Sequence, residues 1–427
     1  MEAGRIIYVG SRAGAPAGEE HDLGDALLLP GLVNAHCHLE LTAMRGFLED
    51  LDFRGWILRL TTSKRAVLTR EKMMDSARYG IAEGLLHGVT TYADTSDSGV
   101  VFDALRERGV RGVMYQEVFG PDPAQSEDAL AGLRAKVEAL RPLETTLVRV
   151  GVSPHAPYTV SDALFEAVAR YAREESLPVA VHIAESDVAQ QLVVAGAGTF
   201  ADGLRGRGIA VGPRARSPVQ LLDSLGVLAA RPLLIHCVRV DETDIATMSA
   251  ARCGIAHCPA SNAKLGHGVA PLLEMLTAGL SVGIGSDSMA SNNRMDILEE
   301  ARLAVLFQRA RQRTPAGISS AAALELATIG GARALGLDRE VGSLEVGKTA
   351  DLAAFSLAGV APTIDPETAA VFAVAGSRAS FVAVAGEPLV CEGRLVGEDA
   401  TLEARVQEVA TELRSWLSTT GRIAVPA

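Results

Sequence analysis

The chain has 427 residues, of which 48% are hydrophobic and 22% charged, and its 40 basic and 52 acidic side chains give a net charge of -12. This length supports one large hydrophobic core with a smaller module beside it. The acidic balance excludes a polyanion such as nucleic acid as the main partner, although a small nucleoside requires no basic surface.

The compartment is indicated by what the sequence lacks. The first thirty residues contain no continuous apolar segment of the kind found in a secretory signal. No uncharged stretch approaches the ~18 residues of a membrane-spanning helix. The five cysteines form no CxxC pair and fit buried free thiols in a reducing environment. We therefore expect a cytoplasmic protein with no membrane partner.

Short apolar runs alternate with longer amphipathic segments from residue 30 to 340. The predicted strands are 28–35, 89–93, 112–118, 148–152, 179–183, 233–237, 254–256 and 282–285, and helices such as 75–86, 161–174 and 270–278 lie between them. Eight such repeats predict an α/β fold, a (β/α)8 TIM barrel. The alternative, an open doubly wound sheet, normally has a glycine-rich phosphate loop after its first strand, where this chain has His36 and His38.

Both ends of the chain differ from this pattern. Residues 5–9 are a strand candidate, and short strands at 381–385 and 389–391 follow the predicted helix 321–335. Residues 401–418 predict a closing amphipathic helix. We expect a small β-sandwich domain built from both termini, with residues 1–29 and 341–427 flanking a metal-dependent barrel of residues 30–340.

Histidines and an aspartate end several of the predicted strands. His36 and His38 are one residue apart, so on a strand their side chains point to the same side. His182 and Asp287 end two other strands, and barrel enzymes keep their active sites at this end. Three imidazoles and one carboxylate suit one divalent cation per chain, zinc or alternatively iron, with a position left for water. Asp287 could also take a proton from that water.

Two further side chains follow strands at the same end. Glu185 comes three residues after His182 and could act as a proton shuttle, or be a solvated residue at a helix start. His236 could hydrogen-bond the attacking water or serve as a fourth nitrogen ligand. The alternative for any lone histidine is a buried structural role. No catalytic role is expected for His21, His87 or His267, although His267 could line the pocket from its loop.

These motifs resemble the amidohydrolase superfamily, in its cytosine/adenosine-type deaminase and chlorohydrolase branch. The resemblance spans nearly the whole chain, through the segments 30–38, 88–91, 153–158, 182–185, 236–238, 257–266, 285–293 and 342–351. It implies a (β/α)8 barrel, a two-ended sandwich and hydrolysis at a carbon that bears nitrogen or halide. It also implies that His155 and Ser291 contact the substrate. Relatives commonly dimerise, so a homodimer is one assembly to expect, although no interface pattern is readable in the sequence.

Some positions depart from that pattern. Leu39 and Glu40 after the His-x-His triplet, with Trp56, resemble the aminodeoxyfutalosine deaminase group of menaquinone synthesis, so Trp56 and Glu40 are predicted substrate contacts. The carboxylate with which nucleoside-type relatives hold ribose hydroxyls is missing after Trp56, and Glu40 or Glu117 could replace it. A binuclear branch uses a lysine near residue 153, but the nearest one, Lys136, lies well before it, which favours a single metal.

Together these features predict a metal-dependent hydrolytic deaminase of an aminated heterocycle, most directly a 6-aminopurine nucleoside of the adenosine or aminodeoxyfutalosine type. One alternative is an amidase or chlorohydrolase that uses the same mononuclear site on a cyclic amide or halogenated heterocycle. Another is a non-catalytic, metal-stabilised binding scaffold, which would need neither Glu185 nor His236. The expected partner is a small molecule.

Overall fold

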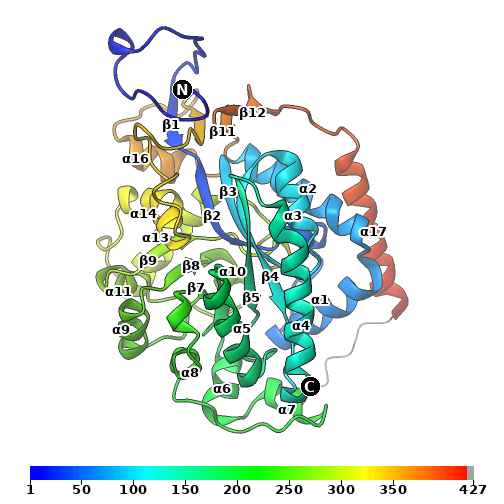
Figure 1. Cartoon of the computed structure of the whole chain (residues 1–427). Coiled ribbons are helices and arrows are strands. Elements are labelled where there is room, and N and C mark those ends of the chain that lie inside the picture. Colours follow the sequence, from blue (N-terminus) through cyan, green and yellow to red (C-terminus); the bar gives the residue numbers. More distant parts are fainter. Residues whose placement is uncertain (421–427) are drawn as a thin grey trace.

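The computed structural model describes residues 1–420 and is built around eight parallel strands (Figure 1). They form two four-stranded sheets, β2-β3-β4-β5 and β6-β7-β8-β9. Parallel bridges Val152–Val179 and Cys37–Asp287 join the two sheets at both edges, so the strands close into a ring. Their bounds are β2 (Leu32–Cys37), β3 (Val89–Ser96), β4 (Arg111–Val118), β5 (Val148–Pro154), β6 (Ala180–Ile183), β7 (Leu233–His236), β8 (Gly254–His257) and β9 (Ser281–Ile284). This parallel α/β architecture fits the predicted TIM barrel.

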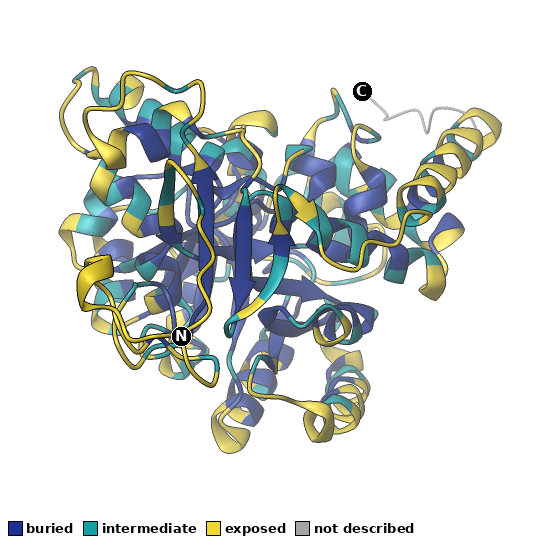
Figure 2. Cartoon of the chain, turned by 90° about the horizontal axis from the view of Figure 1, so that it is seen from above, coloured by how far each residue is buried: buried dark blue, intermediate teal, exposed yellow. Residues whose placement is uncertain are grey.

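Helices surround the ring and leave the strands buried at its centre (Figure 2). In α5, for example, Ser161 caps the amino end by accepting a hydrogen bond from the Leu164 amide, and the buried Phe165, Val168 and Ala172 follow at helical spacing. The helices are α1 (Phe53–Val67), α2 (Arg70–Leu86), α3 (Val100–Arg108), α4 (Ser126–Leu140), α5 (Asp162–Glu175), α6 (Asp187–Ala195), α7 (Thr199–Arg205), α8 (Pro218–Ser224), α9 (Glu242–Ala250), α10 (Pro259–Lys264), α11 (Leu272–Thr277), α12 (Met289–Asn292), α13 (Ile297–Gln312), α14 (Ser320–Ala327), α15 (Ile329–Ala334), α16 (Pro366–Thr368) and α17 (Leu402–Thr420). None of the described helices combines the length and apolarity needed to cross a membrane.

A five-stranded antiparallel sheet combines residues from both ends of the chain. Its order is β1-β10-β11-β12-β13. The bounds are β1 (Ala26–Pro30), β10 (Leu352–Ser356), β11 (Phe381–Val384), β12 (Glu387–Cys391) and β13 (Arg394–Leu395). The packing of a second sheet against it, as a sandwich requires, stays a prediction.

The predicted strand 28–35 is divided at Gly31. β1 pairs with β10 in the antiparallel sheet, whereas β2 pairs with β3 in the barrel. A Cβ atom on Gly31 would lie 2.1 Å from the Thr90 side chain, so the close passage between the two sheets requires glycine. The single apolar run therefore crosses from one sheet to the other.

The predicted strand at residues 5–9 is wrong. Arg5 makes only isolated bridges, to Glu2 and Thr349, and Ile7, Tyr8 and Val9 are exposed. An apolar run becomes a strand only where a partner edge lies beside it, and the edge that β10 offers is taken by β1.

The closing helix was predicted correctly, and it packs near the open end of the barrel. Val406, Val409 and Leu413 of α17 are buried in a cluster with Met44 and the partly buried Trp56. In Figure 1, α17 runs beside α1 and α2. The C-terminal segment therefore supports the wall that carries Trp56.

Candidate metal centre and active-site cleft

The carboxyl ends of the barrel strands bring four potential metal ligands together. His36 lies in β2 and His38 directly follows it, whereas His182 lies in β6 and Asp287 follows β9. The Nε2 atoms of His36 and His38 are 3.2 and 3.5 Å from the same Asp287 oxygen, Oδ1. The Nε2 atoms of His38 and His182 are 3.4 Å apart. These are the four side chains that the sequence predicted as ligands.

Backbone carbonyls orient two of the imidazoles. Nδ1 of His38 donates to the Thr95 carbonyl at 2.7 Å, and Nδ1 of His182 donates to the His155 carbonyl at 3.2 Å. With the proton on Nδ1, each ring presents its Nε2 lone pair to the cluster. Burial lowers the pKa of His38 to about 3 and that of His182 well below its usual value, so both rings are neutral near pH 7.

This donor set fits a divalent cation. Two nitrogen lone pairs that face each other at 3.4 Å repel unless a positive charge lies between them. Ligand atoms about 2.0–2.1 Å from a tetrahedral ion lie about 3.3–3.4 Å from one another, and the measured separations of 3.2, 3.4 and 3.5 Å match this spacing. His36, His38, His182 and Asp287 could therefore hold one such ion.

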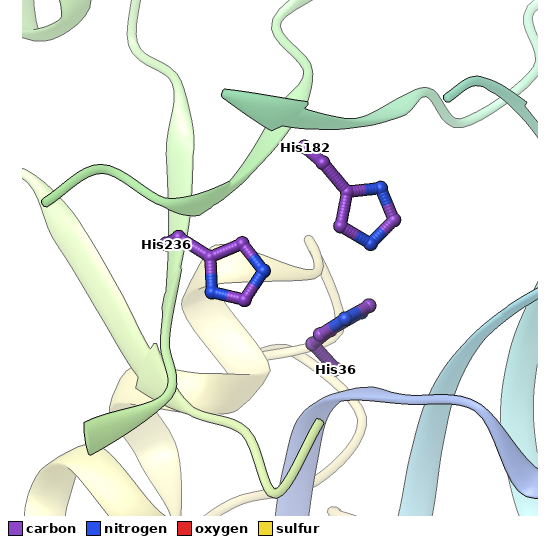
Figure 3. Close-up of side chains that lie close together, drawn as sticks. All are labelled: His36, His182 and His236. Carbon is purple, nitrogen blue, oxygen red and sulfur yellow. The ribbon is translucent and has the colours of Figure 1, made fainter. Parts of the chain in front are cut away.

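His236 faces the same space from β7. Figure 3 shows the rings of His36, His182 and His236, which come from three strands, turned toward one another. One nitrogen from each lies within 4.8 Å of the other two. Nδ1 of His236 lies 3.0 Å from Oδ1 of Asn262, which leaves Nε2 directed to the site. The Asn262 oxygen can only accept, so Nδ1 carries the proton and Nε2 presents a lone pair. That lone pair suits both predicted roles, a fourth ligand or a hydrogen-bond partner of the attacking water.

Glu185 lies between two imidazoles. Its Oε1 is 3.6 Å from Nε2 of His236 and 3.4 Å from Nε2 of His267. Burial raises the pKa of Glu185, but His236 and His267 outweigh that effect and hold it below its usual value. The sequence assigned His267 no catalytic role, and the structure shows instead that it contacts the proposed shuttle. The sequence feature that could have predicted this contact is the position of His267 in the loop after β8, at the same end of the barrel as the ligands.

The backbone is strained where these strands end. His236 has φ +75° and Asp287 has φ +56°, and Ala184, directly before Glu185, has φ +50°. Each non-glycine residue in the left-handed region costs about 1–3 kcal/mol and persists only where the surrounding structure enforces it. Such strain at the ends of three strands, β6, β7 and β9, is typical of a functional site.

A cleft of about 650 Å³ opens over this cluster. Its walls include the aromatic side chains of Phe53, Trp56 and Tyr158. Arg207 and Lys64 also line it, and Lys64 pairs there with Glu40 and Asp97. This volume, with an apolar wall and a few polar groups, suits one small-molecule ligand.

The predicted substrate contacts have different surroundings. Trp56 and His155 line the cleft. Glu40 also lines it, but Lys64 donates to one of its oxygens and Ser98 to the other. Ser291 is fully buried, and its hydroxyl donates to Oδ2 of Asp287 at 2.9 Å. The structure therefore gives Ser291 a role in supporting a potential ligand, because α12 begins directly beyond Asp287 and turns this hydroxyl back toward it.

Comparison with known proteins identifies the family of the chain. Residues 27–389 match the Amidohydrolase family. A 5-methylthioadenosine/S-adenosylhomocysteine deaminase of Moorella thermoacetica is 34% identical over 403 residues, which cover 93% of this chain and 90% of that protein. The chain belongs to the amidohydrolase family and is a hydrolase.

Two solved structures are also similar. One is a zinc-bound adenosine deaminase from Xanthomonas campestris, with a TM-score of 0.81, 30% identity and coverage of 92% of this chain and 87% of that one. The other is the atrazine chlorohydrolase of Arthrobacter aurescens TC1 in complex with zinc, with a TM-score of 0.81, 26% identity and coverage of 97% and 94%.

Proposed function

We propose that the protein is a hydrolytic deaminase of 6-aminopurine nucleosides that releases ammonia. The observation that carries the proposal is the buried Glu185, held between His267 and His236, and His236 clusters with His36 and His182. A site that only stabilises the fold needs no such proton-transfer group. The relatives named as deaminases of adenosine and its thioether derivatives support the same chemistry.

The proposed ligands are His36, His38, His182 and Asp287. A divalent cation bound by them supplies a Lewis acid that lowers the pKa of water toward neutrality. The remaining groups must move protons and stabilise charge at the carbon that loses its amine. Nε2 of His236 is directed to the site as an acceptor and is placed to orient the attacking water.

Two carboxylates account for the protons. The neighbouring imidazoles keep Glu185 ionised, so it must take up a proton before it can deliver one. Glu185 therefore accepts a proton from the attacking water and passes it to the ring nitrogen beside the reacting carbon. Asp287 then takes the proton of the new hydroxyl group and delivers it to the amine. The C–N bond breaks, and a 6-oxopurine and ammonia leave.

The similarity to atrazine chlorohydrolase favours a second candidate, displacement of halide from an electron-poor heterocycle. The same residues could serve it, because water attacks a ring carbon in both reactions. The products separate the two candidates, since deamination releases ammonia and dechlorination releases chloride.

The test is ammonia release by zinc-loaded protein from adenosine, methylthioadenosine, adenosylhomocysteine, aminodeoxyfutalosine, cytosine and guanine. We expect turnover of at least one adenine nucleoside, loss of activity after chelation and recovery on adding zinc. The 5′ group of the best substrate would identify the physiological one. Absence of ammonia from the whole panel, with zinc bound, would refute the proposal, and chloride from atrazine would favour the second candidate.

A further inference from the structure

Glu117 and His155 form a pair on one wall of the cleft. Glu117 lies in β4, and His155 directly follows β5, the neighbouring strand. Both line the cleft. Oε1 of Glu117 and Nε2 of His155 are 4.0 Å apart, and the two side chains are only 6% and 16% exposed. Among residues 1–420, the buried Oε1 of Glu117 finds no hydrogen-bond partner.

Other carboxylates of the cleft lining are already engaged. Both oxygens of Glu40 accept hydrogen bonds, Asp97 pairs with Lys64, and Glu185 contacts two imidazoles. A buried carboxyl oxygen without a partner is costly unless a ligand or a water satisfies it. Glu117 is therefore the wall carboxylate that is best placed to receive a polar group of the substrate.

The contact made by Nδ1 of His155 fixes the orientation of its ring and its tautomer. Nδ1 lies 2.8 Å from the Thr159 hydroxyl, and that hydroxyl donates to the Ala156 carbonyl at 3.1 Å. The Thr159 oxygen can then only accept from His155, so Nδ1 carries the proton. Nε2 of His155 is left as an acceptor that faces Glu117.

The gap between the two side chains is the width of one bridging oxygen atom. At 4.0 Å it exceeds hydrogen-bond length. An oxygen that makes two hydrogen bonds of about 2.8 Å, at an angle between a right angle and the tetrahedral value, holds its partners about 4.0–4.6 Å apart. Burial raises the pKa of Glu117 well above its usual value, so its carboxyl group is protonated and can donate. A hydroxyl group between the two side chains can then accept from Glu117 and donate to Nε2 of His155.

We propose that Glu117 and His155 together bind one sugar hydroxyl of the substrate and so select ribosides over deoxyribosides. This inference rests on the proposed nucleoside deaminase function. It assigns hydroxyl recognition to β4 and β5, a different part of the barrel from the helix that carries Trp56.

The test compares kcat/KM for adenosine, 2′-deoxyadenosine, 3′-deoxyadenosine and 2′,3′-dideoxyadenosine. In the parent protein we expect adenosine to exceed the dideoxy compound by roughly 10–100-fold, because the buried pair is left unsatisfied without the hydroxyl. Glu117→Leu should lower the ratio to near unity by slowing adenosine alone. Glu117→Gln can still donate and accept and should retain most of the ratio. The matched control is Glu300→Gln, a buried carboxyl in α13 outside the cleft lining, which should keep the ratio.

Each outcome decides the inference. A ratio in Glu117→Leu equal to that of the parent protein overturns it, whether or not the absolute rates fall. Equal rates on all four nucleosides in the parent protein also overturn it. Turnover of no adenine nucleoside refutes the proposed function and this inference with it. Glu117, His155 and His182 also form a candidate cation cluster, so loss of a second metal equivalent from Glu117→Leu would overturn hydroxyl binding in favour of a second ion.

Discussion

Replacing Glu185 by glutamine isolates the proposed proton shuttle from the rest of the site. Glutamine keeps the shape and can still hydrogen-bond, but it cannot carry a proton between water and a ring nitrogen. The contacts of Glu185 with His236 and His267 are long, at 3.6 and 3.4 Å, and His236 keeps its bond to Asn262. We therefore expect the fold and the bound metal to persist.

The expected loss in turnover is large. A positioned acid–base group contributes about 10²–10⁴-fold to the rate. The upper part of that range applies, because Glu185 is only 7% exposed and solvent has little access to replace it. We predict that kcat falls by about 10³–10⁴-fold, equivalent to about 4–5.5 kcal/mol of transition-state stabilisation.

The assay follows ammonia release under saturating substrate, with zinc content and thermal unfolding measured on the same samples. Glu300→Gln is the matched control, a buried carboxyl in α13 that accepts bonds from Ala260 and Asn292 away from the cleft. It should retain activity. A kcat for Glu185→Gln within tenfold of the parent value, at equal zinc content, would remove Glu185 from the mechanism.

Three further predictions concern the framework. Arg111 is 3% exposed and binds Asp351 at 2.9 Å, which ties β4 to the antiparallel sheet. Asp351→Ala should cost about 3 kcal/mol in urea unfolding, because the buried guanidinium then keeps only its 3.3 Å contact with Glu340. A loss below 1 kcal/mol would contradict this. A Cβ on Gly285 would lie 2.9 Å from backbone atoms of His36. Gly285→Ala should therefore displace this proposed ligand and weaken zinc binding at least tenfold. An unchanged zinc affinity would refute the close approach. Burial raises the pKa of Glu300 from 4.5 to about 8, so its contribution to stability is complete below pH 4.5 and lost as pH rises to 8. The melting temperature of the parent protein minus that of Glu300→Gln should therefore decrease between pH 4.5 and pH 8. A difference that does not change with pH would contradict this prediction.

Local sequence patterns were sufficient to place the barrel strands. Every predicted run from 89–93 to 282–285 overlaps a parallel strand, because a strand buried on both faces needs only a short, nearly continuous apolar segment. The exceptions are at the ends of the chain. Residues 5–9 lack a free sheet edge, and the run 28–35 is shared between two sheets at Gly31.

The four proposed ligands could also be predicted from the sequence. His36 and His38 share a side because strand side chains alternate, and parallel strands bring His182 and Asp287 to the same end of the barrel. These rules specify which end a side chain occupies, but they do not specify its neighbours.

What the sequence by itself determined is therefore the barrel and the residue types at its catalytic end. Only the tertiary structure decided the contacts among them. His267 reaches Glu185, Ser291 binds Asp287, and Glu40 is neutralised by Lys64 while Glu117 retains an unpartnered oxygen. The physical reason is the distance along the chain over which each feature is determined. A strand pattern depends on residues two positions apart, whereas these contacts depend on how loops separated by tens of residues pack once the ring has closed.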